Sequence, residues 1–334
     1  MASKLRWLLV GPGDIAQKRV APALASAEGS EIAGIVYSTR KDRALALADA
    51  YGVPQVFDDF NTALDRSDAG AVYLATPVWL HSAHAVQALE SGRHVLIEKP
   101  LGLSEADCLP VLHAAEKTGL TAGCAYYRRC FPRYRHAVEM LAAGEFGKVV
   151  YVCATWFSWF DPSPHDPKYW RVIKRKSGGG PLLDIASHML DLIIGLFGLP
   201  ISVHAVCDSL AHEWDVEDTA SLVMKLDCGA HAVGMFGWSS GTWRHDFQIA
   251  GTGARLDWQP CDCGPVTKTV GREVKSLDMP NADNVHLPLV EDFVRAVLDR
   301  RPPVCPVQEA VKTNQLLDAA YASAAQGRQV KVRP

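Results

Sequence analysis

Short apolar runs alternate with Ala- and Leu-rich stretches of helical character up to about residue 123. The runs occupy residues 5–10, 32–37, 71–75 and 94–97. Each run is apolar almost throughout, as expected for parallel strands that helices cover on both faces. Strands that alternate with helices in this way are typical of βαβ units. The pattern therefore predicts an α/β domain over residues 1–123, built on a doubly wound parallel sheet.

Polar and apolar positions alternate in longer runs after Gly123. These runs cover residues 149–157, 202–207, 219–226, 231–238 and 247–250. Such alternation indicates strands with one buried face, so we expect a large, mainly antiparallel or mixed sheet. Helices are predicted at 182–197 and over 287–325, where Arg301-Pro302-Pro303 interrupts the second. Residues 124–334 therefore form a predicted second domain of the α+β class.

The length of 334 residues fits two domains of about 150 residues each. There are 34 basic and 37 acidic residues, a net charge of −3, and 48% of the residues are hydrophobic. This balance excludes a disordered chain and gives no basic surface for nucleic acid. No run of about 18 apolar residues occurs, and Gly11 ends the first apolar run too early for a signal peptide. We expect a cytoplasmic protein that does not bind membranes.

The nine cysteines are scattered between Cys108 and Cys305 with no C-x-x-C pair. An odd number without paired spacing argues against a disulfide framework and against a zinc ribbon. Cys261 and Cys263 are the one close pair, and residues at this spacing do not usually share a tetrahedral metal site. We therefore expect reduced, unligated thiols and no bound metal.

A glycine turn follows the first predicted strand directly. It reads Gly11-Pro12-Gly13-Asp14-Ile15-Ala16, a G-x-G-x-x-A sequence that opens a predicted helix. The first glycine permits the tight turn, the second lets the backbone approach a pyrophosphate, and the small alanine lets helix and strand pack closely. The phosphate then binds at the helix N-terminus. We predict a Rossmann dinucleotide-binding domain, and the alternative is a purely structural turn.

The segment after the second predicted strand bears on the choice of cofactor. An acidic residue at this point usually holds the ribose hydroxyls. This chain instead has hydroxyl and guanidinium side chains, from Ser38, Thr39, Arg40 and Arg43. Such groups bind a 2′-phosphate, which a carboxylate repels, so NADP is the expected cofactor. The alternative is that the basic side chains only solvate a helix start and that NAD binds.

Two further loops follow the third and fourth predicted strands, at the ends where parallel sheets bind their ligands. The candidate residues are Thr76, Pro77, Trp79 and His81 in the first loop, and Glu98 and Lys99 in the second. Pro100 follows Lys99 directly, and a lysine beside a proline at a strand end is unusual in a surface turn. From the residues alone, Lys99 is either a site residue or a solvated charge.

Asp184, His188 and Asp191 share one face of the predicted helix 182–197, because they are spaced by four and three residues. An aspartate one turn before a histidine fixes its tautomer and raises its pKa, which suits a general acid or base. The alternatives are a structural pair or two ligands of a metal, but no H-E-x-x-H or C-x-x-C sequence supplies the others. The glycines of segment 177–181 give the helix an expected flexible approach.

In order and spacing, these segments resemble the Gfo/Idh/MocA oxidoreductases, the relatives of glucose-fructose oxidoreductase and inositol dehydrogenase. The matching segments are the turn at Gly11, Ala75-Thr76-Pro77 with His81, Glu98-Lys99-Pro100, and Gly178 to Asp191. The resemblance spans almost the whole chain. It implies a Rossmann domain and a second domain whose sheet often joins subunits, hence a homodimer or homotetramer. It also implies that Lys99, Asp184 and His188 are the catalytic residues.

Within the family, an NADP-dependent reductase matches further positions. The matches are Ser38, Thr39 and Arg43 at its phosphate-binding positions, and Trp170-Arg171 at a pair that contacts the cofactor. Two positions depart from it: Ala125 replaces an asparagine near the nicotinamide, and His286 replaces a tyrosine. These departures leave the cofactor assignment intact, with His286 among its contacts, and bear on the choice of substrate.

Aromatic side chains are frequent between residues 156 and 171. Aromatic faces suit the C–H surface of a sugar, and polar tips suit its hydroxyls. We expect substrate contacts from Trp156, Tyr169 and Tyr127, besides those from the three catalytic residues. The alternative for these rings is packing, with alternate side chains of 149–157 in the core of the sheet.

The resulting prediction is an NADP-dependent enzyme that moves a hydride between the nicotinamide and a carbinol or ketone carbon of a sugar, polyol or keto-sugar. His188 exchanges a proton with the substrate oxygen, Lys99 polarises that oxygen, and Asp184 orients the pair. An NAD-dependent glycoside hydrolase of the same fold and a non-enzymatic NADP-binding regulator are the alternatives.

Overall fold

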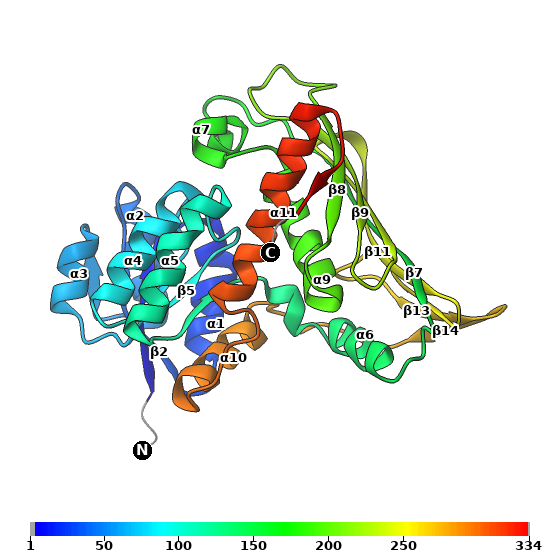
Figure 1. Cartoon of the computed structure of the whole chain (residues 1–334). Helices are drawn as coiled ribbons and strands as arrows, with labels where there is room; N and C mark the ends of the chain where they lie inside the picture. The colour runs from blue at the N-terminus through cyan, green and yellow to red at the C-terminus, as the bar shows by residue number, and fades with distance from the viewer. Residues whose placement is uncertain (1–3, 333–334) are drawn as a thin grey trace. The chain divides into compact units, whose positions relative to one another are not determined.

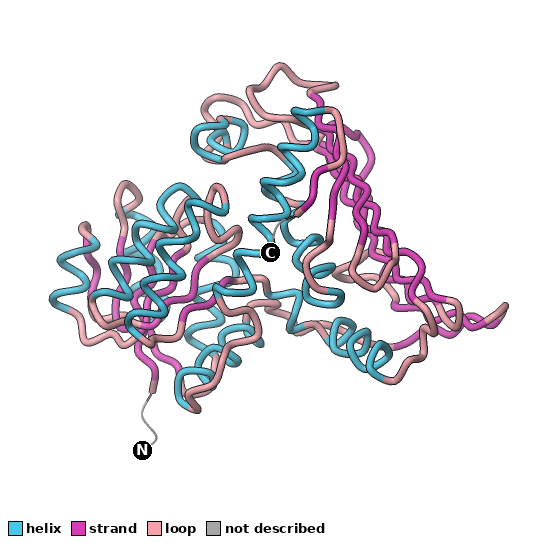
Figure 2. Tube along the Cα trace, in the orientation of Figure 1, coloured by secondary structure: helices cyan, strands magenta, loops and turns pink. Residues whose placement is uncertain are grey.

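The computed structural model describes residues 4–332, which form two compact units. One unit contains the described residues up to Gly102, with Ala106–Cys130 and Ala282–Val311. The other contains Leu103–Glu105, Phe131–Asn281 and the described residues from Lys312 onward. Each unit has its own sheet (Figure 1, Figure 2). The predicted boundary at residue 123 divides the chain differently, because the late segment packs with the first unit.

The first unit holds a parallel sheet of six strands in the order β3-β2-β1-β4-β5-β6. The strands are β1 (Leu5–Val10), β2 (Ser30–Val36), β3 (Gln55–Phe57), β4 (Ala71–Leu74), β5 (His94–Ile97) and β6 (Ala122–Cys124). The four predicted strands are confirmed, and β3 and β6 add three residues each. The strand order reverses between β1 and β4, which is where such sheets bind ligands beyond their carboxyl ends.

The carboxyl ends of the central strands lie in register. Val10 pairs with Val36 on one side and with Leu74 on the other. Leu74 in turn pairs with Ile97. The loops that follow β1, β2, β4 and β5 therefore start at one edge of the sheet, and these are the loops with the predicted cofactor contacts.

Helices cover both faces of this sheet. They are η1 (Ala16–Val20), α1 (Ala21–Ser26), α2 (Lys41–Tyr51), α3 (Phe60–Arg66), η2 (Val78–Leu80), α4 (His81–Glu90), α5 (Glu105–Thr118), η3 (Tyr127–Cys130) and α10 (Leu287–Leu298). Leu8 lies in a core with α3, α4 and α5, whereas Trp7 lies in the opposite core with α1, α2 and α10. Successive β1 residues are thus buried on opposite faces, which explains the unbroken apolar run. Phe293 of α10 lies 5.4 Å from Trp7, between ring centroids.

The second unit holds a mixed sheet of nine strands in the order β14-β13-β12-β11-β7-β10-β9-β8-β15. The strands are β7 (Val149–Trp159), β8 (Ser202–Asp208), β9 (Thr219–Lys225), β10 (His231–Gly237), β11 (Ser239–Gly251), β12 (Arg255–Trp258), β13 (Val266–Val270), β14 (Glu273–Leu277) and β15 (Val330–Lys331). Neighbouring strands are antiparallel apart from β7 and β10, which pair in parallel. The predicted, mainly antiparallel sheet is confirmed.

The helices of the second unit cover one face of its sheet. They are α6 (Pro132–Ala142), η4 (Tyr169–Val172), α7 (Lys174–Ser177), α8 (Pro181–Asp184), α9 (Ala186–Phe197) and, from Lys312 onward, α11 (Val307–Gln326). α8 and α9 contact the central strands β7, β9 and β10. In β9, Leu222 and Met224 on the covered face are each 1% exposed, whereas Val223 on the opposite face is 53% exposed.

The predicted helix 182–197 is not continuous, so this part of the prediction is wrong. It divides at Ile185 into α8 and α9, and the segments Lys174–Asp184 and Ala186–Phe197 form an angle of 54°. The Ser187 hydroxyl donates to the Asp184 carbonyl oxygen at 2.9 Å, a side-chain bond that competes with the regular backbone pattern. By length and apolar character, no single described helix qualifies as a membrane span, and this bent pair alone passes such a test.

Candidate functional site

The glycine turn after β1 has the geometry that its sequence predicts. Gly11 has a φ of +90°, and an added β-carbon would lie 2.9 Å from the Ala75 carbonyl oxygen. Its N–H donates to the Val36 carbonyl oxygen at 2.9 Å. A side chain at this position is therefore excluded both by conformation and by contact with the loop after β4.

Gly13 lies in open space, because nothing lies within 4 Å of an added β-carbon. The helical segment begins directly after it, at Asp14, and the small Ala16 is fully buried against the sheet. The first N–H groups of a helix have no partner within the helix, and here they lie beside an uncovered backbone. A dinucleotide pyrophosphate fits this arrangement, since the open space at Gly13 allows close backbone approach at the start of a helix, where an anion is favoured.

The two arginines after β2 are each paired with a carboxylate. Arg43 contacts Asp14, with 2.7 Å between Nη1 and Oδ1. Arg40 contacts Asp42 at 2.8 Å, and this hydrogen bond lowers the pKa of Asp42 to about 2. Ser38 and Thr39 are exposed beside them. The Asp14–Arg43 pair joins the glycine turn to the segment that is predicted to hold the 2′-phosphate.

His81 connects the two loops that follow β4 and β5. Its side chain is buried, with Nδ1 2.9 Å from the Pro100 carbonyl oxygen and Nε2 2.8 Å from the Thr76 carbonyl oxygen. Burial lowers the pKa of His81, while both carbonyl oxygens oppose that shift. His81 therefore positions the Thr76-Pro77 and Lys99-Pro100 segments, although its sequence position suggested a cofactor contact. The Thr76 hydroxyl is buried without a hydrogen-bond partner among the described residues.

Glu98 is a buried carboxylate at the end of β5, directly before Lys99. Glu98 Oε1 accepts from the Tyr73 hydroxyl at 2.9 Å and lies 3.3 Å from His286 Nε2, while Oε2 accepts from the Lys99 N–H at 3.3 Å. Burial raises the pKa of Glu98, but the bonds to His286 and Tyr73 and the charge of Lys99 outweigh it, so the pKa lies below its usual value. This network fixes the backbone that carries the half-buried Lys99.

His286, directly before α10, lies beside Glu98 at the same end of the sheet. It is 2% exposed, and its ring lies 4.8 Å from that of Tyr127. Its Nδ1 is buried with no hydrogen-bond partner in the described chain. Besides the Thr76 hydroxyl, His286 thus gives this edge a second polar group that is available to a bound ligand.

In the second unit, the triple glycine is a rigid packing element, and the expectation of a flexible approach is wrong. An added β-carbon at Gly179 would lie 1.9 Å from the Tyr321 hydroxyl oxygen, and one at Gly180 would lie 1.9 Å from the Glu217 carbonyl oxygen. The Glu217 carboxylate accepts from the Gly180 and Leu182 N–H groups at 3.0 and 3.1 Å. Glu217, which the sequence did not single out, therefore anchors the start of α8 and positions Asp184.

Asp184 and His188 lie on either side of the break between α8 and α9. Arg171 Nη1 donates to Asp184 Oδ2 at 2.5 Å, a pairing that spacing along the helix does not reveal. His188 is 6% exposed, with its ring stacked at 6.1 Å and 30° to that of Trp156. Asp191 is fully buried one turn later. The second unit thus offers a carboxylate held by a guanidinium and, four residues further along the chain, a buried imidazole.

An aromatic cluster adjoins these residues. Trp156, Phe160, Tyr169 and Trp214 pack, partly exposed, against a core of Val172, Ile185, Val216 and Trp238. Trp156 and Tyr169 were predicted substrate contacts, whereas Trp214 comes from the loop before β9 and was not. The Arg171 guanidinium lies 5.5 Å from the Trp170 ring, so this predicted cofactor pair also lies beside Asp184.

The predicted residues therefore fall into two groups. The first unit brings together the glycine turn, the segment after β2, the loops with Thr76 and Lys99, and the side chains of Tyr127 and His286. The second unit brings together Arg171, Asp184 and His188 with the aromatic cluster.

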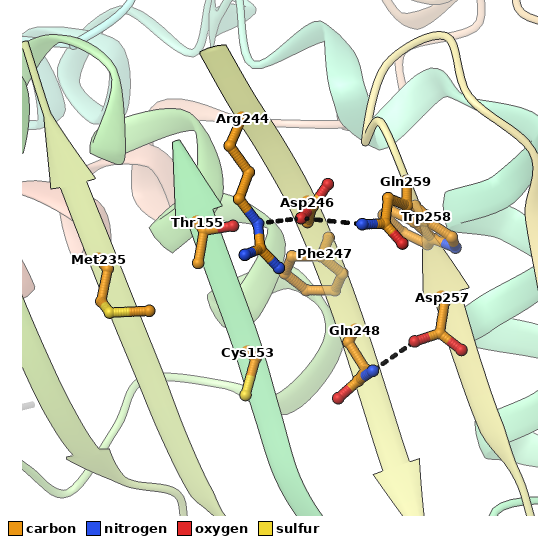
Figure 3. Close-up of a pocket in the computed structure, with 10 residues that line it drawn as sticks. All are labelled: Cys153, Thr155, Met235, Arg244, Asp246, Phe247, Gln248, Asp257, Trp258 and Gln259. Atoms are coloured by element: carbon orange, nitrogen blue, oxygen red, sulfur yellow. Dashed lines mark hydrogen bonds and ion pairs between the residues drawn. The ribbon is translucent and has the colours of Figure 1, made fainter. Parts of the chain in front are cut away.

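A separate pocket of about 250 Å³ lies on the sheet of the second unit and includes none of the predicted site residues. Its lining comes from Cys153, Thr155, Met235, Arg244, Asp246, Phe247, Gln248, Asp257, Trp258 and Gln259 (Figure 3). Arg244 pairs with Asp246, and Gln248 with Asp257, so its polar groups largely satisfy one another (Figure 3).

Comparison with known proteins gives matches over both units. Residues 5–126 match the family described as "Oxidoreductase family, NAD-binding Rossmann fold". Residues 134–257 match "GFO/IDH/MocA C-terminal domain". The two matches together cover well over half of the chain.

Individual relatives agree with these matches. D-xylose 1-dehydrogenase (NADP(+)) 2 of Haloferax volcanii is 28% identical over 331 residues, 97% of this chain and 98% of that protein. The 1,5-anhydro-D-fructose reductase of Ensifer adhaerens is 30% identical over 188 residues, 56% of this chain and 55% of that protein. The aldose-aldose oxidoreductase from Caulobacter crescentus, solved with glycerol, has a TM-score of 0.89 and 25% identity, covering 98% of this chain and 99% of that one.

Proposed function

The chain belongs to the Gfo/Idh/MocA oxidoreductase family, and on that premise we propose that it is an NADP-dependent dehydrogenase or reductase of a sugar, polyol or keto-sugar. The proposal rests chiefly on one observation. The glycine turn, in which Gly11 has a positive φ, and the loop of Lys99 both start at the carboxyl ends of the parallel strands on either side of β4. Substrates named for the relatives, an aldopentose, an anhydro-keto-sugar and an aldose, support a carbohydrate as the reacting partner.

The bound nicotinamide supplies the hydride acceptor or donor, and the protein supplies binding and proton transfer. Gly11 and Gly13 accommodate the pyrophosphate, and the Thr76 hydroxyl and His286 Nδ1 are available as polar contacts. We assign to Lys99 the polarisation of the substrate oxygen, since the buried Glu98 network fixes its backbone. His188 exchanges the proton with that oxygen, and Asp184, held by Arg171, supports the charge that develops.

A screen of cofactor turnover tests this function. Aldoses, inositols, glycosides and keto-sugars are each incubated with NADP or NAD, and with the reduced forms, while nicotinamide absorbance is followed. Net oxidation or reduction of cofactor with at least one substrate is the expected result. Release of an aglycone without net cofactor change identifies a hydrolase instead, and tight NADP binding without turnover of any compound identifies a regulator.

The preference for NADP is part of the proposal, supported by the absence of an acidic side chain among Ser38, Thr39 and Arg40. We expect Arg43→Ala to weaken NADP binding about 10- to 100-fold and NAD binding hardly at all, because one charge-assisted contact to the 2′-phosphate is lost. Titration of both cofactors by calorimetry measures the difference. Arg66→Ala, which removes an exposed guanidinium at the end of α3, is the matched control. Equal loss for the two cofactors contradicts the assignment.

We also propose a homodimer or homotetramer formed through the sheet of the second unit, in a cytoplasm that keeps the nine cysteines reduced. Its uncovered face carries exposed apolar side chains, with Val206 54%, Val223 53% and Met235 40% exposed. Val223→Lys introduces a charge in the middle of β9 on this face and is expected to lower the mass measured by light scattering to that of a monomer. As a control, Leu45→Lys, at a 50% exposed site on α2, is expected to leave the measured mass unchanged. An unchanged mass in Val223→Lys rules out this interface.

A further inference from the structure

Three potential metal ligands come together in the second unit, and only one of them, Cys261, belongs to the close cysteine pair of the sequence. His245 lies on β11, and Cys261 and Asp262 lie in the turn between β12 and β13. One ligand atom from each residue lies within 4.8 Å of the others. His245 is 3% exposed and Cys261 is fully buried. Cys263 is exposed and is not part of the cluster.

The backbone of this turn is held firmly, so the ligand atoms are positioned in advance. The Cys261 N–H donates to the His245 carbonyl oxygen at 2.6 Å, which ties the turn to β11. The Gly264 N–H donates to the Pro260 carbonyl oxygen at 2.8 Å, and an added β-carbon at Gly264 would lie 2.0 Å from the Pro260 nitrogen. The Asn281 amide also bonds the Asp262 carbonyl oxygen. Preorganised ligands of this kind lower the cost of metal binding.

We propose that His245, Cys261 and Asp262 bind a zinc ion. An imidazole nitrogen, a thiolate sulfur and a carboxylate oxygen are the three donor types that Zn²⁺ prefers, and a thiolate disfavours Mg²⁺ and Ca²⁺. Met189 Sδ lies 3.4 Å from His245 Nε2, which adds a further soft atom beside the cluster. Three protein donors leave the fourth position of a tetrahedral site for water or for this thioether.

The charges around the cluster are compatible with a divalent cation. Arg133, which is 2% exposed, donates to the Cys261 carbonyl oxygen at 2.6 Å and to the Met279 carbonyl oxygen at 3.3 Å. The guanidinium of Arg133 is thus held by backbone carbonyl oxygens, whereas ionised Cys261 and Asp262 carry two negative charges. Zinc binding converts the Cys261 thiol to a thiolate and releases its proton, so the two anionic ligands offset the charge of the metal.

Zinc at this position has a structural consequence for the candidate catalytic histidine. The ring of Trp156 stacks on that of His245 at 4.0 Å and 25°, and the ring of Trp156 also stacks on that of His188 at 6.1 Å. A metal that fixes the His245 ring therefore fixes the Trp156 ring against His188. The zinc site stands apart from the proposed dehydrogenase activity, and either is testable without the other.

The test uses the full-length protein, stripped with a chelator and dialysed against Zn²⁺, with metal content measured by mass spectrometry. Wild type and Cys263→Ser are expected to retain one zinc ion per chain. Cys261→Ser and Asp262→Asn are expected to bind zinc at least about 100-fold more weakly, measured by competition with a chromophoric chelator. Replacement of zinc by Co²⁺ should give a thiolate-to-cobalt absorption band in wild type and Cys263→Ser that Cys261→Ser lacks.

The zinc proposal is wrong if wild type retains no zinc, or if Cys261→Ser binds zinc with wild-type affinity. Asp262→Asn provides the second variant in case Cys261→Ser does not fold, because Asp262 is only partly buried. Circular dichroism of both variants establishes folding before the metal measurements, and no enzyme assay enters either readout.

Discussion

His188→Ala should lower kcat by about 10²- to 10⁴-fold, the usual contribution of a positioned general acid or base. The imidazole is 6% exposed and lies beside Trp156 in the second unit, whereas the dinucleotide turn belongs to the first. Removal of the imidazole deletes the group that exchanges the substrate proton and leaves that turn unaltered. NADP affinity should therefore stay close to that of wild type. Steady-state kinetics on the substrate found in the screen, with cofactor affinity from calorimetry, measures both quantities.

A pH profile separates proton transfer from a structural role for His188. Wild type should show an ionisation in kcat that His188→Ala lacks, and a merely misfolded variant would lose rate without losing that ionisation. His204→Ala, an exposed histidine on β8, serves as the matched control with an unchanged profile. A near-normal kcat in folded His188→Ala would show that another group carries the proton.

Lys99→Ala is expected to lower kcat by about 10³-fold, because a cation that polarises the reacting oxygen acts mainly in the transition state. The Glu98 network holds the Lys99 backbone through its N–H, so truncating the side chain leaves the loop in place. Steady-state kinetics should show this loss mainly in kcat and little in KM.

Two further variants define the role of Lys99. Lys99→Met keeps the length of the side chain without its charge and should be as slow as Lys99→Ala. Lys117→Ala, which removes a 77% exposed ammonium at the end of α5, should behave as wild type. A fast Lys99→Met variant would mean that the charge of Lys99 is not needed for turnover.

The fold of the first unit could be predicted because its signals are local. Its four longer strands are mainly apolar, and the Gly11 turn has the spacing that a strand, a turn and a helix impose. β3 and β6 were missed because three residues are too few to show a period. The packing of Phe293 on Trp7 could not be predicted either, because the amphipathic pattern of α10 indicates a buried face but not the residues that it packs against.

The candidate site could be predicted as far as each residue belongs to a compact motif. Lys99, Asp184 and His188 stand in such motifs, and the family resemblance implied their catalytic roles, whereas their supporting partners come from other parts of the chain. Glu217 anchors the triple glycine from a loop beyond β8, and nothing in its own surroundings indicates this. The same holds for the proposed zinc ligands, because His245 lies on β11 and Cys261 lies in the turn between β12 and β13.

Direct hydride transfer between nicotinamide and substrate carbon is the central claim, and isotope transfer tests it most directly. NADPH carrying deuterium at either face of C4 is oxidised with a carbonyl substrate found in the screen, and the product is examined by NMR and mass spectrometry. Hydride transfer predicts that one of the two labelled cofactors places a single deuterium on the carbon that bears the new hydroxyl. A product without that deuterium, or one labelled only when the reaction runs in D₂O, would contradict the claim.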